Sequence, residues 1–588
     1  MSMGIGKPKF LESLQNYHQT YILLISVFIG MLVGVATSLM KTFVIFLKNW
    51  VEMLTMEDHL RVLFFVLPVV GILLTILFLR YIIKDDVRHG IPRILYVLAK
   101  KTHMKQHKVF SSFVGGAITS GFGGSAGLES PIISTGASIG SFFSKKLNLD
   151  YKTTALLMGC GAAGAISSIF YTPIAAVVFG VEVLMLDLTT TSIIPLLVTS
   201  ITGAITASRF MPVEVVFQFP IKESATLHDF PFLILLGILT GLLSVYFNRA
   251  NFSIQKIFNN KGKKPLIRAA GMISLGILIL LFPPLYGEGY DVLKTIINQG
   301  PAEVMNSSLF SALSDNYWMI FVFLVLITLL KVVTTTLTIE SGGVGGVFAP
   351  AVFTGGLGGY LFADSINRLY SSWELSEENY AIVGMAGVLG GVLHAPLTAI
   401  FFAAEITEGY QLMLPLMLVS AISFVTNKFF DSHSIFNRQL ADQGIKLSHN
   451  KDHNVLTLLS VEEVIDKDFL TIGPGATLGD LTKKIAKSRR NIFPVVDDKG
   501  FFLGLVAMDD VREDMFKPEL YSQPVKKYII QPDDFVSTTD TMEKVMEKFN
   551  LTGYYNLPVI DEGKYIGFIS RSNTFSVYRK MLLDISYE

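Results

Sequence analysis

The stretch GFGGSAGLESP at residues 121–131 is the most informative segment of the chain. Four glycines and one carboxylate, Glu129, lie in it between two apolar runs, and Pro131 is expected to open the next helix. A carboxylate in such hydrophobic surroundings costs free energy unless it is paired, protonated or placed in a water-filled cavity. Glu129 is therefore the first candidate for a functional residue.

The residues around Glu129 point to a site for an anion. Glycines allow the backbone to approach a small ligand closely. The first N–H groups of a helix that opens near Pro131 have no partner within that helix and lie at the positive end of its dipole. A halide-sized anion and the Glu129 carboxylate would compete for these N–H groups, and protonation would let the side chain leave. The alternative, from this stretch alone, is a lipid-buried glycine hairpin that holds a neutral or hydrogen-bonded glutamate.

The composition is that of a polytopic membrane protein. Of the 588 residues, 51% are hydrophobic and only 16% are charged. The formal net charge is zero, which gives no support for nucleic-acid binding. The single cysteine, Cys160, excludes an intrachain disulfide, and no cluster of His, Asp and Glu has the spacing of a metal site. No nucleophile–base pair is apparent either, so we do not expect an enzyme.

The apolar runs fall into two length classes. The long runs could each cross about 30 Å of hydrocarbon, and they lie at 21–48, 61–85, 190–208, 230–248, 266–283 and 318–339. Shorter segments, in which we expect breaks at Gly or Pro, lie at 109–120, 131–146, 153–168, 173–186, 348–366, 380–393 and 396–406. Interrupted half-length helices are typical of transporters, where irregular backbone lines a cavity.

Two matches within the sequence indicate an internal duplication. GGSAGLESP (123–131) and SGGVGGVFAP (341–350) are each followed by Thr-Gly at the same distance from the proline. GCGAAGAISSIFYTPIAAVVFGVE (159–182) similarly resembles GMAGVLGGVLHAPLTAIFFAAE (384–405), with equal spacing from proline to the final glutamate. A duplication of this kind predicts a substrate site where the two halves meet. The second glutamate, Glu405, is expected to cap a helix or pair with a cation.

From about residue 454 the chain becomes charged and loses its long apolar runs, so a soluble domain is expected. Residues 468–511 and 534–575 each predict a short strand, an amphipathic helix, an apolar strand, a Gly-containing turn, a second strand and a helix. The tail is therefore a β-α-β-β-α unit used twice.

Four motifs resemble those of the CLC chloride channels and transporters. The family's motif G-[KR]-E-G-P corresponds to GLESP (127–131) in this chain, and its motif G-x-F-x-P corresponds to GGVFAP (345–350). The family's G-S-G-I-P corresponds to RHGIPRIL (88–95). HAPLTAIFFAAEITEGYQLMLP (394–415) is similar to the family pattern along its length. The tail resembles a tandem CBS-domain pair, which many CLC proteins carry.

The resemblance implies an α-helical polytopic membrane protein with an inverted internal repeat, the CLC fold, followed by a cytoplasmic α+β tandem CBS domain. The implied parts are a cytoplasmic N-terminal segment at 1–20, a transmembrane domain at 21–440, a linker at 441–453, and CBS domains at 454–516 and 517–588. A homodimer in the plasma (inner) membrane is also implied. It would contact lipid, keep both termini in the cytoplasm, and have chloride and related anions, not nucleic acid, as partners.

The resemblance also assigns roles to individual residues. Glu129 falls on the gating glutamate, whose side chain would occupy the outer anion site until it is protonated or displaced. Val347 and Phe348 fall on residues whose backbone N–H groups coordinate the central anion. Further anion donors are expected near 89–92 and 127–131, at His89, Gly90, Ile91, Gly127 and Leu128.

Two of the expected anion contacts depart from the family pattern. His89 stands where the family usually has a serine that contacts the central anion, and its imidazole could make conduction depend on pH. Alternatively, the side chain turns away and the backbone N–H of Gly90 or Ile91 takes over. Phe436 stands where the family's central tyrosine supplies a hydroxyl, so the inner gate would be apolar and hold the anion less tightly. Phe436 could equally be a packing residue.

A third departure bears on proton coupling. Proton-coupled members carry an internal glutamate that passes protons towards the gating glutamate, and Val183 falls on that position. Because valine cannot carry a proton, the usual relay is missing, although a water chain or another carboxylate could replace it.

In the tail, CBS pairs commonly bind adenine nucleotides between the repeats. Asp510 falls on the family's ribose-contacting aspartate, and the second repeat has Asn573 there, with Ser570 three residues before it. An adenine nucleotide could therefore bind, but no cofactor is required. A tail that only stabilises the dimer is the alternative.

These observations predict chloride-selective anion transport gated by Glu129, and we favour a passive, voltage- or pH-gated channel. The first alternative is a chloride/proton antiporter of the same family. From a different class, the CBS pair could be a nucleotide sensor with the membrane part as its effector. A fluoride exporter is disfavoured, because such members typically replace the gating glutamate with asparagine.

Overall fold

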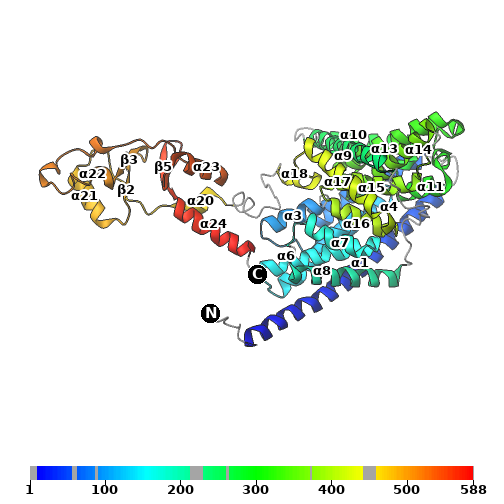
Figure 1. Cartoon of the computed structure of the whole chain (residues 1–588), viewed down its shortest axis with the longest axis horizontal. Coiled ribbons are helices and arrows are strands. Elements are labelled where there is room, and N and C mark those ends of the chain that lie inside the picture. The colour runs from blue at the N-terminus through cyan, green and yellow to red at the C-terminus, as the bar shows by residue number, and fades with distance from the viewer. Residues whose placement is uncertain are drawn as a thin grey trace. The chain divides into compact units, whose positions relative to one another are not determined.

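The computed structural model describes residues 9–55, 62–85, 90–187, 189–211, 229–259, 264–306, 308–370, 374–441 and 459–586. His89 and all but the first residue of the predicted linker at 441–453 lie outside the described residues. The chain divides into two compact units, Met1–Gln443 and Gly444–Glu588. In its described part the first unit is helical, whereas the second combines helices with short strands (Figure 1).

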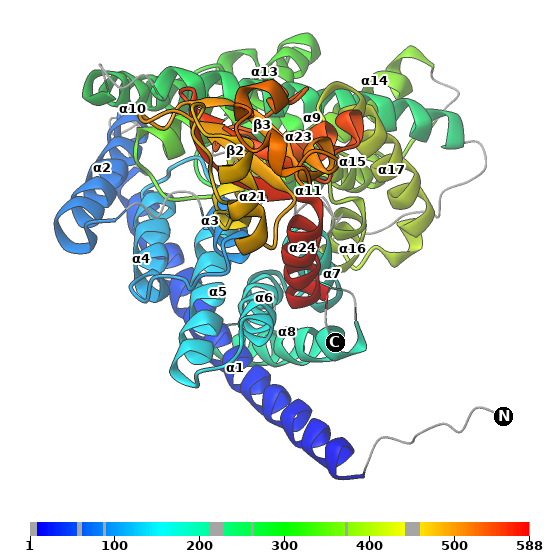
Figure 2. The same cartoon turned by 90° about the vertical axis from the view of Figure 1, so that its left-hand side faces the viewer.

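The helices of the first unit follow the apolar pattern of the sequence. They are α1 (Lys9–Thr55), α2 (Leu63–Leu77), α3 (Gly90–Ala99), α4 (Lys108–Gly121), α5 (Glu129–Lys146), α6 (Tyr151–Phe170), α7 (Pro173–Glu182), α8 (Thr190–Phe210), α9 (Phe230–Phe258), α10 (Lys264–Leu281), α11 (Tyr290–Gln299), α12 (Pro301–Asn306), α13 (Tyr317–Ser341), α14 (Phe348–Leu369), α15 (Glu377–Leu393), α16 (Pro396–Ile406), α17 (Met413–Phe430) and α18 (Ile435–Ala441). The long helices α1 and α8 lie side by side (Figures 1 and 2), and their contact is close because Gly30 has no side chain: a Cβ there would meet Thr202.

Seven helical stretches within the described ranges are long and apolar enough to cross a membrane. Five of them correspond to long apolar runs of the sequence, whereas the run at 266–283 forms a shorter apolar helix, Pro265–Leu281. The other two stretches are Tyr151–Phe170 and Tyr410–Ala441.

Glycine does not interrupt the helices at 153–168 and 348–366, where the sequence predicts breaks. α6 and α14 are continuous over 20 and 22 residues. Their glycines instead allow helices to touch through the backbone, because a Cβ built on Gly161 of α6 would lie 2.0 Å from the carbonyl oxygen of Gly136 in α5. The prediction of breaks was wrong for these two helices, and the glycines serve packing. It was also wrong for the segments at 109–120, 131–146 and 380–393, which lie within the continuous helices α4, α5 and α15.

The duplication is visible in matching contacts of the two halves. Gly136 of α5 packs on Gly161 of α6, and Gly355 of α14 packs in the same way on Gly384 of α15, where each ideal Cβ would lie 2.3 Å from the other's carbonyl oxygen. α7 and α16 are both short, with 10 and 11 residues, and each has proline in its first turn. Proline favours that position since it has no N–H to leave unpaired.

The two halves also cap each other's short helices. Glu405, at the end of α16, accepts hydrogen bonds from the N–H groups of Ile174 (3.0 Å) and Ala175 (2.8 Å) at the start of α7. Glu182, at the end of α7, accepts from the N–H of Leu397 (3.2 Å) and of Thr398 (2.7 Å) at the start of α16. Carboxylates are stabilising at helix starts. The expectation that Glu405 caps a helix is confirmed.

The second unit is built from two repeats that exchange segments. Its elements are α20 (Val461–Val464), β1 (Ile465–Asp466), α21 (Leu478–Lys487), β2 (Ile492–Val496), β3 (Phe502–Ala507), α22 (Met508–Val511), α23 (Met542–Thr552), β4 (Asn556–Asp561), β5 (Lys564–Ser570) and α24 (Arg571–Ser586). β2 pairs with β3, but β1 pairs with β5 of the second repeat in a sheet of order β1-β5-β4. Val525 and Tyr528, between the repeats, pack into the core of the first repeat.

Candidate functional site

Two helix starts meet between the two halves of the first unit. α5 begins at Glu129 and α14 at Phe348. Just before them, Gly127 and Gly346 form an antiparallel bridge: the N–H of Gly127 donates to the carbonyl of Gly346 at 3.0 Å, and the reverse bond is 2.8 Å. The first turns of two helices, with their positive dipole ends, therefore adjoin one bridge.

The Glu129 side chain folds back over the start of its own helix. It is 1% exposed, and the hydroxyl of Tyr290 donates to its Oε1 at 3.1 Å. Its Oε2 is buried and has no hydrogen-bond partner among the described residues. This oxygen lies 1.9 Å from where a Cβ of residue 127 would be, so the glycine at that position makes room for the carboxylate.

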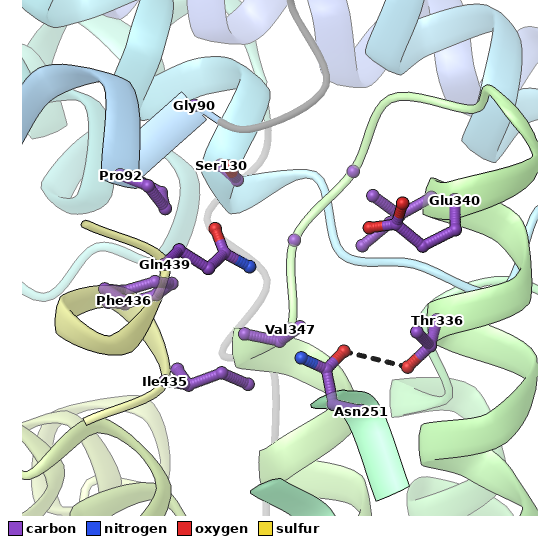
Figure 3. Close-up of a pocket in the computed structure, with 13 residues that line it drawn as sticks. Gly90, Pro92, Ser130, Asn251, Thr336, Glu340, Val347, Ile435, Phe436 and Gln439 are labelled. Carbon is purple, nitrogen blue, oxygen red and sulfur yellow. Dashed lines mark hydrogen bonds between the residues drawn. The ribbon is translucent and has the colours of Figure 1, made fainter. Parts of the chain in front are cut away.

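A cavity adjoins the two helix starts, and Figure 3 shows its lining. The lining residues come from helices far apart in sequence and are Gly90, Pro92, Ser130, Asn251, Thr336, Ile339, Glu340, Gly345, Gly346, Val347, Ile435, Phe436 and Gln439. We refer to it as the Phe436 cavity. It combines glycine backbone with polar side chains, which suits a small hydrated ligand.

The structure brings some of the predicted anion contacts together at this cavity. Gly90, Val347 and Phe436 line it. Ile91 is buried in the first turn of α3, and Phe348 packs against Phe402 with ring centroids 4.7 Å apart. Gly127 and Leu128 precede α5 but are not among the lining residues.

Val183 lies at the end of α7 and is buried. Its N–H donates to the carbonyl of Phe179 at 2.9 Å. It is not among the described residues that line the Phe436 cavity. The side chain offers no group that could take up a proton.

A cluster of polar side chains in the cavity was not predicted from the sequence. Glu340 is only 6% exposed and accepts a hydrogen bond from Gln255 Nε2 at 3.1 Å. The hydroxyl of Thr336 donates to Asn251 Oδ1 at 2.9 Å (Figure 3). The sequence contained one signal for this cluster: Glu340 directly follows a long apolar run, and an acid within a membrane segment indicates a functional residue.

A second group was also missed, in the turn Gly-Glu-Gly-Tyr at 287–290. The N–H of Leu128 donates to Glu288 Oε1 at 2.8 Å. Lys331 of α13 is fully buried, and its Nζ donates to the carbonyl of Gly287 at 2.7 Å. The signals in the sequence were an acid between two glycines and a lysine within an apolar helix.

In the second unit the predicted nucleotide contacts differ in their surroundings. Asp510 is exposed on α22. Ser570 accepts a hydrogen bond from the N–H of Asn573 at 3.0 Å, and Asn573 Nδ2 donates to the carbonyl of Val464 at 3.1 Å. Asn573 thus joins α24 to α20.

No group of three or more His, Cys, Asp or Glu suited to a metal ion occurs in the described part of the chain.

Known proteins share this architecture. The family model described as "Voltage gated chloride channel" matches residues 70–428, and the CBS domain model matches 461–517 and 525–578. Chloride channel protein CLC-f of Arabidopsis thaliana is 27% identical over 447 residues, which cover 67% of this chain and 56% of the plant protein. The H(+)/Cl(-) exchange transporter ClcA of Vibrio campbellii is 28% identical over 360 residues, 60% of this chain and 73% of that protein. The crystal structure of a slow cyanobacterial Cl-/H+ antiporter superposes with a TM-score of 0.63 at 23% identity, over 72% of this chain and 97% of that one.

The fold and the site define a multi-pass membrane protein in which two repeats bring their helix starts together beside a buried glutamate. The chain belongs to the voltage-gated chloride channel (CLC) family and carries a pair of CBS domains after its membrane unit. The expected CLC fold with a tandem α+β CBS domain is confirmed.

Proposed function

We propose that this chain carries anions, chloride foremost, across a membrane and that Glu129 gates their pathway. The observation that carries the proposal is the bridge between Gly127 and Gly346, which joins two helix starts beside a buried carboxylate. Helix starts bind anions through backbone N–H groups and the positive end of the dipole, so they select anions over cations. The names of the relatives, a chloride channel and an exchange transporter, support the same assignment.

The gate would work by competition. When ionised, Glu129 occupies the space over Gly127 and denies it to the anion. A proton on the carboxylate, or a high anion concentration, would release the side chain. The anion would then reach the Phe436 cavity and the backbone of Gly90 and Val347. Phe436 offers no hydroxyl there, so the anion would leave easily.

Family membership alone supports the remaining assignments. Two copies would form a homodimer with one pathway each, both termini would lie in the cytoplasm, and the membrane would be the plasma (inner) membrane. The CBS pair would bind an adenine nucleotide through Asp510, as a regulator. Calorimetric titration of the full chain with ATP tests this last point, since Asp510→Asn should then abolish the binding heat.

We favour a passive channel, because Val183 cannot carry a proton. One observation favours the chloride/proton antiporter: Glu340 is a buried carboxylate in the lining of the Phe436 cavity. It could pass protons in place of a glutamate at residue 183.

The zero-current potential of the protein in liposomes, with a fixed chloride gradient and a varied proton gradient, tests both candidates. A channel gives a potential that follows chloride alone. A shift in fixed ratio to the pH difference would establish antiport. Glu340→Gln should then remove the shift, whereas Glu303→Gln, at an exposed position that does not line the cavity, should not. If the zero-current potential of liposomes that contain the protein does not depend on the chloride gradient, the proposed function is overturned.

A further inference from the structure

A second carboxylate, that of Glu288, holds a backbone N–H at the start of α5. Leu128 donates this N–H to Glu288 Oε1 at 2.8 Å, although the two residues are 160 positions apart in the chain. Leu128 is one of the donors assigned above to the anion. Because the Glu288 carboxylate accepts the hydrogen bond of this N–H, Glu288 competes with the anion for it, as Glu129 also competes with the anion.

The turn at 287–290 is built for this contact. Gly287 and Gly289 have φ values of +65° and +102°, a region that favours glycine. The N–H of Gly287 donates to the carbonyl of Gly123 at 3.3 Å, which ties the turn to the stretch that leads into α5. The position of Glu288 is therefore fixed by the backbone on both sides of the residue.

The same turn touches both carboxylates. Glu288 accepts from Leu128, and two residues later the hydroxyl of Tyr290 donates to Glu129. Lys331 Nζ donates hydrogen bonds to the carbonyls of Gly287 (2.7 Å) and Leu285 (3.4 Å) and so connects the turn to α13.

Charged and titratable groups of four helices face Glu288. They are Lys41 and Lys48 of α1, Glu129 of α5, Tyr290 and Asp291 of α11, and Lys331 of α13. Basic side chains of α1 and α13 therefore lie around the pair of acids, and each acid adds to the barrier that an anion meets whenever it is ionised.

We propose that Glu288 is a second gating residue, which withholds the Leu128 N–H from the anion while Glu129 withholds the space over Gly127. The inference rests on the proposed function. When ionised, Glu288 makes a charge-assisted hydrogen bond, which is stronger than a neutral one. A proton from bulk water removes that charge, the bond weakens, and the N–H becomes available; the proton returns to water when the anion leaves.

A gate of two acids makes a prediction that a gate of one does not. Glu129→Gln removes only one of the two ionisable barriers, so chloride flux should keep a residual activation by acid of about tenfold between about pH 7.5 and pH 4.5. The double variant Glu129→Gln/Glu288→Gln should lose this residual activation, and its chloride flux should be independent of pH.

The experiment is chloride flux from liposomes at both pH values, for the full chain, the two single variants and the double variant. Asp291→Asn is the matched control, because it removes a charge beside the same turn from a side chain that is 72% exposed and pairs with Lys48 instead of α5. Glu288→Asp, which keeps the charge on a shorter side chain, should raise flux at pH 7.5 and keep its activation by acid.

Each outcome decides the matter. Residual acid activation in Glu129→Gln that the double variant lacks supports the inference. A Glu129→Gln variant without pH dependence, together with Glu288→Gln behaving like Asp291→Asn, overturns it and leaves the proposed function intact. If Glu288→Gln lowers flux equally at both pH values and Glu288→Asp restores it, the residue is structural and the inference fails. Absence of chloride flux from the unaltered protein would overturn the proposed function and this inference with it.

Discussion

Gly127 and Gly346 exchange both of their backbone hydrogen bonds, at 3.0 and 2.8 Å, and so join the two repeats at equivalent positions. Each lies four residues before the proline of its repeat, Pro131 or Pro350. The bridge holds the start of α5 against the start of α14. A Cβ added at Gly127 would meet the Glu129 carboxylate, whereas one added at Gly346 would first meet Ser130 Cβ, at 2.9 Å.

Gly127→Ala should weaken the gate without unfolding the protein. The new Cβ would lie 1.9 Å from Glu129 Oε2, the far end of a flexible side chain that can move away. We expect chloride flux at neutral pH to rise several-fold as the carboxylate is displaced. Liposome flux measures this, with Gly180→Ala as the control, since the nearest atom to its new Cβ is 3.4 Å away. Unchanged flux in Gly127→Ala would contradict the assigned position of the carboxylate.

The sequence was sufficient to predict the duplication and to place the starts of α5 and α14 to within two residues, since the helices begin at Glu129 and Phe348 and not at Pro131 and Pro350. Glycine and proline mark local backbone conformation, and their equal offsets in 123–131 and 341–350 are visible without a structure. The same glycines misled the prediction within α6 and α14, because a glycine that permits close helix packing looks like one that ends a helix. Packing partners such as Gly136 and Gly161 are known only once the fold is.

The remaining parts of the site depend on contacts between distant segments. Glu288 reaches Leu128 across 160 residues, and Glu182 caps α16 instead of its own helix. Periodicity and turn chemistry describe neighbours along the chain, so they carry no information on such pairs. An acid in an apolar setting still marks a candidate, and by this criterion Glu288 and Glu340 could have been found with Glu129.

Phe436→Tyr should make the Phe436 cavity hold the anion more tightly. The added hydroxyl would bring one hydrogen-bond donor to a lining whose aromatic ring now offers none. We expect the chloride concentration at half-maximal flux to fall about threefold to tenfold, and the maximal rate to fall with it. Phe429→Tyr, at an 85% exposed position, is the control and should change neither quantity. Equal values for both variants would show that Phe436 serves packing alone.

Removal of the reciprocal caps should destabilise the membrane unit. Glu182→Ala and Glu405→Ala each leave two N–H groups of a half-buried helix start without an acceptor. A loss of about 1–2 kcal/mol of unfolding free energy is expected for each variant. Thermal unfolding in detergent measures it, and Glu408→Ala, an exposed acid just beyond α16, is the control. A melting temperature equal to that of the control would argue against the caps as a source of stability.

Asn573→Asp should destabilise the CBS pair. The substitution replaces the Nδ2 donor with an oxygen 3.1 Å from the carbonyl of Val464, so a hydrogen bond becomes a repulsion. The unfolding free energy should fall by about 1–3 kcal/mol. Thermal unfolding with and without ATP is the measurement, and the exposed Asp510→Asn is the control for stability. If Asn573→Asp were stabilised by ATP beyond the unaltered protein, residue 573 would contact the nucleotide instead.

Asp561 should make the second CBS repeat sensitive to acid. Its Oδ1 accepts from Ser537 Oγ at 2.6 Å and from the N–H of Thr538 at 3.2 Å, and Oδ2 accepts from the Thr538 hydroxyl. These bonds from the Ser537 and Thr538 side chains hold the pKa of the Asp561 carboxyl below its ordinary value of 3.8. The folded state therefore favours the ionised form, and its contribution to stability is present above about pH 4 and lost as the pH falls through the lowered pKa.

Asp561→Asn removes this contribution at neutral pH. Hydrogen–deuterium exchange of residues 534–570 in the full chain should be faster in the variant than in the unaltered protein at pH 7. The ratio of the two rates should fall towards one as the pH is lowered from 3.8 through the lowered pKa of Asp561. The ratio cancels the intrinsic effect of pH on exchange. Asp498→Asn, an exposed aspartate in the turn before β3, is the control and should exchange as the unaltered protein does at each pH. A ratio that stays constant with pH would mean that Asp561 stabilises the repeat through shape instead of charge.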